Sequence, residues 1–308
     1  MRNKQKKTFF LLLGMLMVIY AVSSANGETI LKEDFETGNY SNNWSVWLQD
    51  SNCNTGTTLR VNSQAAHRGS YGLGIHYILD DDPRGDCQLH QDNNTCLIYH
   101  PPVPLKHYFF RGYFKFKLNA NDLCSSPTVQ RKLIYFKPEN YNAGGWAFFI
   151  VAWPWGNNCD DNGYCLSLAY IGNGAMGATL WGDGSPGFNK SYNHIRANEW
   201  YYLEVEVQYR TYGKDIVRIW LAPDGETPKM IFERTDLTLR SESDASSDIG
   251  LGTIEVGRQV DVNRSSYNQG WIDEYRYWDD IVIGTEFIGP VGSSGSPPGP
   301  PQNARIAH

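Results

Sequence analysis

The chain has 308 residues and a formal net charge of −6, from 27 Lys and Arg against 33 Asp and Glu. Nucleic acids and anionic membranes both require clustered Lys and Arg, and the only basic block stands at the very start of the chain. We therefore expect neither as a partner. Ten Trp and 19 Tyr are a heavy aromatic load. Such rings fill a β core, and exposed ones offer flat platforms on which sugar rings can stack.

The first 27 residues have the pattern of an export signal. Basic residues between Arg2 and Lys7 precede an apolar run from Phe9 to Val22, and small residues around Ala25 follow it. The run is shorter than the about 20 apolar residues of a membrane span. We expect residues 1–27 to be removed and the mature chain to be soluble and secreted, either outside the cell or into the periplasm.

Residues 28–290 are predicted to form one all-β domain. In residues 108–118, Phe110 and Phe114 alternate with Arg111 and Tyr113, and residues 201–209 repeat this period of two. Gly, Pro and Asn clusters separate such segments, and no amphipathic helix of ten or more residues is evident. The pattern predicts an antiparallel two-sheet β-sandwich with under about a tenth of its residues helical. Residues 291–308, rich in Pro, Gly and Ser, read as a linker or disordered tail.

Six Cys in an exported chain favour disulfides, and six allow 15 connectivities among which sequence alone does not choose. Two close pairs stand out, Cys87 with Cys96 and Cys159 with Cys165, leaving two other Cys to pair over a distance. The polar stretch between Cys159 and Cys165 can turn tightly enough for a bridge. We predict that this second pair forms.

Several segments, taken in order, resemble the concanavalin A-like jelly rolls, a superfamily of polysaccharide lyases, glucanases and carbohydrate-binding modules. The domain begins with Leu31-Lys-Glu-Asp-Phe-Glu-Thr-Gly38, continues with His67-Arg-Gly-Ser-Tyr-Gly-Leu-Gly-Ile75, and ends with Tyr277-Trp-Asp-Asp-Ile-Val-Ile283. The resemblance is to lyase-like and laminin-G-like members and spans most of residues 28–290. It implies a concave sheet whose polar side chains line a groove for a glycan.

A lyase of this kind cleaves uronate-containing polysaccharides by β-elimination. The reaction requires a group that neutralises the substrate carboxylate, a base for the C5 proton and an acid for the 4-linked oxygen. The polar faces of the strands supply suitable types, although each residue could equally be an ordinary solvated one. The candidate catalytic residues are Arg111, Tyr135, Lys137, Tyr141, Tyr202 and Glu204, and the candidate substrate-binding residues are Arg131, Trp155, Trp181 and Gln208.

Tyr141 enters this set through a local resemblance. Tyr135-Phe-Lys-Pro-Glu-Asn-Tyr-Asn142 is similar to a motif of alginate lyases whose second Tyr is catalytic, but that motif should stand near the end of its domain. Glu204 and Glu206 share a strand face about 6.6 Å apart, which suits a glycosidase pair as well. The Glu-x-Asp-x-x-Glu strand of jelly-roll glucanases is absent, so glycoside hydrolysis ranks lower.

The resemblance also implies a structural calcium ion between the first and last strands, because hard oxygen ligands suit Ca²⁺. Its candidate ligands are Glu33, Asp34, Gly69 and Asp280. The alternative is that these are ordinary acids at strand ends. We expect no organic cofactor.

Two functions remain open. The first is a secreted, monomeric lyase acting on an acidic polysaccharide, and the second is a non-catalytic carbohydrate-binding jelly roll. We predict for the first that Arg111, Tyr135 and Tyr202 project from one concave sheet face. Finding these side chains on opposite faces would favour the binding module.

Overall fold

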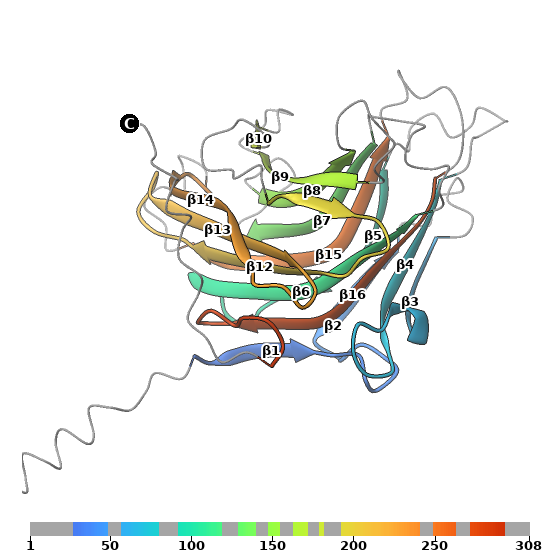
Figure 1. Ribbon diagram of the computed structural model, residues 1–308. Coiled ribbons are helices and arrows are strands. Elements are labelled where there is room, and N and C mark those ends of the chain that lie inside the picture. Colours follow the sequence, from blue (N-terminus) through green and yellow to red (C-terminus); the bar gives the residue numbers. More distant parts are fainter. Residues whose placement is uncertain are drawn as a thin grey trace, which may run out of the picture.

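The computed structural model shows a sandwich of two layered antiparallel β-sheets (Figure 1). The only helix in the described part of the chain is a short 3₁₀ turn, Ser63–Ala65. None of the described residues forms a helix that is long and apolar enough to cross a membrane. The structure describes residues 27–48, 57–79, 92–118, 129–139, 147–154, 163–171, 179–181, 192–240, 249–262 and 272–292.

Sheet A contains both the first and the last strand. Its strand order is β14-β13-β12-β6-β16-β4-β3, and β1 also pairs with β16. The strands are β1 (Thr29–Glu33), β3 (Thr58–Asn62), β4 (Gly72–Leu79), β6 (His107–Leu118), β12 (Tyr201–Gln208), β13 (Asp215–Pro223), β14 (Lys229–Leu237) and β16 (Ile272–Gly284).

Sheet B has the order β10-β9-β8-β7-β15-β5-β2, with β11 also paired to β9. Its strands are β2 (Trp44–Leu48), β5 (Asp92–Tyr99), β7 (Val129–Pro138), β8 (Ala147–Pro154), β9 (Gly163–Ile171), β10 (Thr179–Trp181), β11 (His194–Arg196) and β15 (Leu251–Val262). The central pairs, such as β7 with β15, join segments that lie more than a hundred residues apart in the chain.

One hydrophobic core fills the space between the sheets. The period of two turns Phe110 and Phe114 of β6 inward from sheet A, and Ile134 and Phe136 of β7 meet them from sheet B. Side chains at the alternate positions form separate outer clusters. The predicted single antiparallel sandwich is therefore confirmed.

A β-bulge in β7 overturns one prediction. The pairing of β7 with β8 slips by one residue between Lys132 and Ile134, which inverts the alternation at that point. Arg131 consequently faces the core, 1% exposed, instead of the outer face with Tyr135. Its Nε lies 2.5 Å from Glu274 Oε2. The prediction that Arg131 binds substrate is wrong, because this guanidinium is enclosed between the sheets.

Only some of the cysteines lie in the part of the chain that the structure describes. Cys96 is a free, buried thiol in the structure, against the expectation that it pairs with Cys87. The predicted bridge from Cys159 to Cys165 involves Cys159, which lies outside the described residues. That pairing stays a prediction, as do the export signal and the tail, which are also outside the described part.

Candidate functional site

The predicted catalytic residues are divided between the two outer faces of the sandwich. On sheet A, β12 pairs with β6 so that Glu204 stands opposite Arg111, and Tyr202 lies on the same face. On sheet B, Tyr135 belongs to an outer cluster with Phe149, its ring 4.5 Å from that of Phe149. The expectation that Arg111, Tyr135 and Tyr202 share one face is therefore wrong.

The sheet A group has a structural task, which is to hold the segment 285–292 that follows β16. Glu204 accepts hydrogen bonds from the backbone N–H groups of Ile288 (2.7 Å) and Gly289 (3.0 Å). The Tyr202 hydroxyl also donates to this carboxylate. Arg111 donates to the carbonyl oxygens of Asp280 and Gly289 at 3.0 and 3.3 Å. We call Arg111, Tyr202 and Glu204 the clamp.

Burial dominates the electrostatics of the clamp. It raises the pKa of Glu204 to about 7, although the hydrogen bonds from Tyr202, Ile288 and Gly289 favour the ionised form. Burial, followed by the Glu204 charge, also raises the pKa of Tyr202 far above its ordinary value. Neither group contacts open solvent, because Glu204 is fully buried and Tyr202 is 1% exposed. The catalytic roles predicted for the clamp residues have no support in this arrangement.

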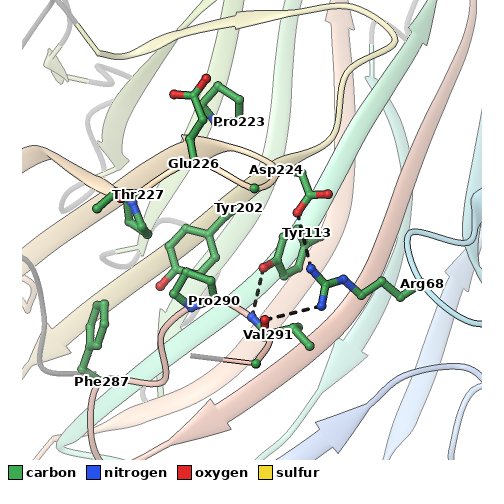
Figure 2. Close-up of a pocket in the computed structure, with 13 residues that line it drawn as sticks. Arg68, Tyr113, Tyr202, Pro223, Asp224, Glu226, Thr227, Phe287, Pro290 and Val291 are labelled. Atoms are coloured by element: carbon green, nitrogen blue, oxygen red, sulfur yellow. Dashed lines mark hydrogen bonds and ion pairs between the residues drawn. The ribbon is translucent and has the colours of Figure 1, made fainter. Parts of the chain in front are cut away.

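A pocket of about 410 Å³ lies beside the clamp, between the segment 285–292 and the turn that joins β13 to β14 (Figure 2). Arg68 reaches across its mouth, with contacts to Asp224 at 3.9 Å and to the Val291 carbonyl oxygen at 3.4 Å. The Tyr113 hydroxyl accepts a hydrogen bond from the backbone N–H of Val291. Of the clamp residues, only Tyr202 contributes to its lining.

The outer face of sheet B carries a denser set of chemically useful groups. Tyr135 and Lys137 come from β7, Glu255 and Arg258 from β15, and Trp47 from β2. The Lys137 ammonium and the Arg258 guanidinium both form ion pairs with the Glu255 carboxylate. The guanidinium carbon also lies 4.8 Å from the Tyr135 ring and 4.8 Å from the Trp47 ring. We call these five residues the sheet B cluster.

The sheet B cluster contains a lysine suited to proton transfer at neutral pH. Burial, reinforced by the positive charge of Arg258, lowers the pKa of Lys137 to about 7, whereas the ion pair with Glu255 favours the charged form. A lysine with such a pKa is a neutral amine in a large fraction of molecules near pH 7 and can then accept a proton. Tyr135 supplies a hydroxyl beside it, and Arg258 carries a permanent positive charge. The cluster thus combines a base, a proton donor and a group for an anion.

The other predicted residues do not join this cluster. Gln208 lies on sheet A, where its Nε2 donates to Glu206 at 2.6 Å. Glu206 also pairs with Arg218, so the two same-face glutamates, Glu204 and Glu206, are both engaged within the fold. Tyr141 and Trp155 lie outside the described residues, and so does the side chain of Trp181 at the end of β10.

The predicted calcium ligands lie near the corner where β1 meets the end of β16. The Glu33 carboxylate accepts backbone N–H groups of Phe35 and Ser41, while Asp34 pairs with Lys32 at 2.8 Å. Asp280 contacts His67 at 3.0 Å, and Gly69 has a positive φ of 75°. In the described part of the chain, no three acidic, His or Cys side chains gather as a metal-binding group. As arranged here these residues do not form an oxygen cage, and a calcium ion stays a prediction from the resemblance.

Sequence reasoning missed Glu255, Arg258 and Trp47. The strand β15 carries Glu255 beside Tyr135 through a pairing of β15 with β7, and β5 and β2 follow on its other side. Such neighbours are set by pairing across long sequence separations, for which a single chain offers no local signal. The alternating pattern of residues 251–256 was the only available hint, and it predicts a strand and not its partner.

No protein-family model and no curated protein sequence matches the chain. Solved structures do. The endo-β-1,4-glucuronan lyase of the fungus Trichoderma reesei superimposes with a TM-score of 0.57 at 13% identity, covering 84% of this chain and 97% of that one. The PL-14 alginate lyase of Aplysia kurodai gives 0.54 at 12% identity, covering 85% and 100%. At such identities the likeness concerns the fold. The chain has an antiparallel two-sheet β-sandwich fold that is similar to that of these polysaccharide lyases.

Proposed function

We propose that the protein is a secreted, lyase-like enzyme that cleaves an acidic, uronate-containing polysaccharide by β-elimination on the outer face of sheet B. The observation that carries the proposal is the grouping of Lys137 with Tyr135 and Arg258 around the Glu255 carboxylate on this face. The fold, shared with a glucuronan lyase and an alginate lyase, supports the same substrate class.

Each group has a role in this reaction. The neutral amine of Lys137 takes the proton from C5 of the uronate, and Arg258 neutralises the adjacent carboxylate so that the developing negative charge is stabilised. The electrons of the C5–H bond form the C4–C5 double bond while the C4–O bond breaks. The Tyr135 hydroxyl donates a proton to the leaving oxygen. Trp47, 37% exposed, offers a ring on which a neighbouring sugar can stack.

The test is ultraviolet absorbance of the C4–C5 unsaturated product on a panel of uronate polysaccharides. Lys137→Ala should abolish product formation, and Tyr135→Phe should reduce it strongly while binding of the polymer persists. Lys229→Ala removes an exposed lysine of β14 on the other sheet and serves as the matched control. Product formation that survives Lys137→Ala would refute the assignment.

A non-catalytic glycan-binding jelly roll is the second candidate. It is favoured because Tyr135 lies on the outer face of the opposite sheet from Arg111 and Tyr202. It is also favoured because the side chains of Tyr135 and Lys137 are only 3% and 8% exposed. That function predicts no unsaturated product from the unmodified protein on any uronate polymer. It also predicts equal loss of glycan binding in Lys137→Ala and Tyr135→Phe.

A further inference from the structure

A second surface suited to sugars lies on the opposite side of the sandwich, on the outer face of sheet A. It is a hollow of about 500 Å³ lined by residues of β3, β4 and β16. These strands lie at the end of sheet A away from β14 (Figure 1). Its lining includes Arg60, Asn62, Gln64, His76, Tyr275 and Tyr277. We call this surface the sheet A trough.

Strand register places the lining residues of the trough on one face of sheet A. Arg60 of β3 stands opposite Gly74 of β4, which in turn stands opposite Tyr277 of β16. A Cβ atom at Gly74 would lie 2.6 Å from the Asn62 amide nitrogen and 3.5 Å from the Tyr277 ring. Only a residue without a Cβ atom leaves room here for the Asn62 side chain to lie against β4.

The same register extends the trough onto β6 with two lysines. Lys115 stands opposite Tyr277, and Lys117 stands opposite Tyr275. The Lys115 ammonium lies 5.1 Å from the Tyr277 ring centre and 4.7 Å from that of Trp200, and Lys117 lies 5.7 Å from the Tyr275 ring. From β3 to β6 the rows cross three strand spacings, about 14 Å. That is enough to contact more than one sugar ring.

The charged residues of the trough indicate that its ligand is an anion. The whole chain carries a net charge of −6, yet no acidic residue is among the described residues that line the trough. Arg60, Lys115 and Lys117 make no ion pair within the described part of the chain. Burial, and then the neighbouring Lys117, lowers the pKa of Lys115, so a bound anion would stabilise the charged form. The trough thus places tyrosine rings next to Arg and Lys side chains that have no carboxylate partner in the described part of the chain, and this combination suits a glycan that carries carboxylates.

We propose that the sheet A trough binds a stretch of acidic polysaccharide, with Arg60 and Lys117 contacting the carboxylates and with Tyr275, whose ring stacks on that of His76 at 3.9 Å, contacting a sugar ring. The surface lies across the core from Lys137, so it would hold a polymer without taking part in bond cleavage. It would act equally in a lyase and in a binding module.

The test uses Lys137→Ala protein, which avoids turnover, and fluorescently labelled oligogalacturonate, oligomannuronate and oligoglucuronate, with a labelled neutral glucan for comparison. At least one uronate should bind, more weakly at high salt because exposed charges are screened. Introducing Arg60→Ala and Lys117→Ala together into this protein should weaken binding about tenfold. The reason is that two exposed charge contacts are lost, each of which contributes up to about 1 kcal/mol. Tyr275→Phe should retain most of the affinity and Tyr275→Ala should not.

The matched control removes two exposed lysines away from the trough, Lys214→Ala in the turn before β13 and Lys229→Ala in β14, which should leave the affinity nearly unchanged. Equal weakening by the control pair, equal binding of the neutral glucan, or no uronate binding by folded Lys137→Ala protein would each overturn the proposal. The lyase proposal is tested separately, by product formation from short oligosaccharides. The trough variants leave the sheet B cluster intact, so the outcome of that assay does not depend on binding in the trough.

Discussion

Replacing Glu204 by Gln should become more favourable for stability as the pH rises from acidic to alkaline values. Glu204 is fully buried in the clamp, and burial raises its pKa from 4.5 to about 7. Below pH 4.5 the carboxyl is protonated in both the folded and the unfolded chain. Between 4.5 and about 7 the unfolded chain loses this proton first, so the folded state binds more protons and its stability falls as the pH rises.

The size of the effect follows from the same pKa. Each pKa unit corresponds to about 1.4 kcal/mol, so the rise from 4.5 to about 7 makes ionisation cost about 3 kcal/mol once the pH exceeds 7. Gln cannot ionise, so its effect on stability does not vary with pH, and its carbonyl oxygen can accept only one of the two backbone N–H groups, because those of Ile288 and Gly289 are bound by different oxygens of Glu204. The difference in unfolding free energy between Glu204→Gln and the unmodified protein should therefore shift by about 3 kcal/mol in favour of Gln between pH 4 and pH 8.

Urea unfolding followed by tryptophan fluorescence at several pH values measures this difference. The neighbouring Glu206 provides a control of opposite sign. Burial alone would raise its pKa, but hydrogen bonds from His107 and Arg218 lower it. Ionised Glu206 thus stabilises the fold above pH 4.5. The unfolding free energy of Glu206→Gln should therefore fall further below that of the unmodified protein as the pH rises from acidic toward neutral values. A Glu204→Gln difference that is constant across the pH range would refute the reasoning.

The remaining predictions concern the core, the sheet B cluster and the free thiol. Glu274→Gln should cost about 3–5 kcal/mol in urea unfolding, because it removes the buried carboxylate that pairs with both Arg131 and Arg276, whereas Glu233→Gln, in a half-exposed pair, should cost under about 1 kcal/mol. Equal costs would contradict the enclosed ion pair. Product formation on a uronate polymer should rise with pH through about 7, where Lys137 loses its proton, and a rate that falls across that range would exclude Lys137 as the base. Cys96 is buried, and burial raises its pKa to about 11, so a thiol reagent should modify it only after unfolding.

Local sequence patterns were sufficient for much of the fold. Alternation in residues 108–118 and 201–209 predicted strands whose inner and outer faces the structure confirms at Phe110, Arg111 and Tyr202. A strand's period is a property of its own residues, and it states which side chains share a face. The ordered segments, taken together, were enough to indicate a jelly roll.

What the period of two could not state is which sheet each strand joins. The sequence pattern placed Tyr135 and Tyr202 on the polar faces of their strands. However, β7 and β12 belong to different sheets, so the two side chains point away from each other. Arg131 shows a second limit. One extra residue at the bulge in β7 turned this side chain from the surface into the core, and only the pairing with β8 reveals the bulge.

The sequence by itself therefore determined the class of fold, the strand faces and the chemical types available for a site. The tertiary structure alone decided that Arg111 and Glu204 hold the segment 285–292, and that Lys137 lies beside Glu255 and Arg258. The physical reason is that a site is made by strands that pair across long separations. Burial at those pairings then sets the pKa values, such as that of Lys137, on which the chemistry depends.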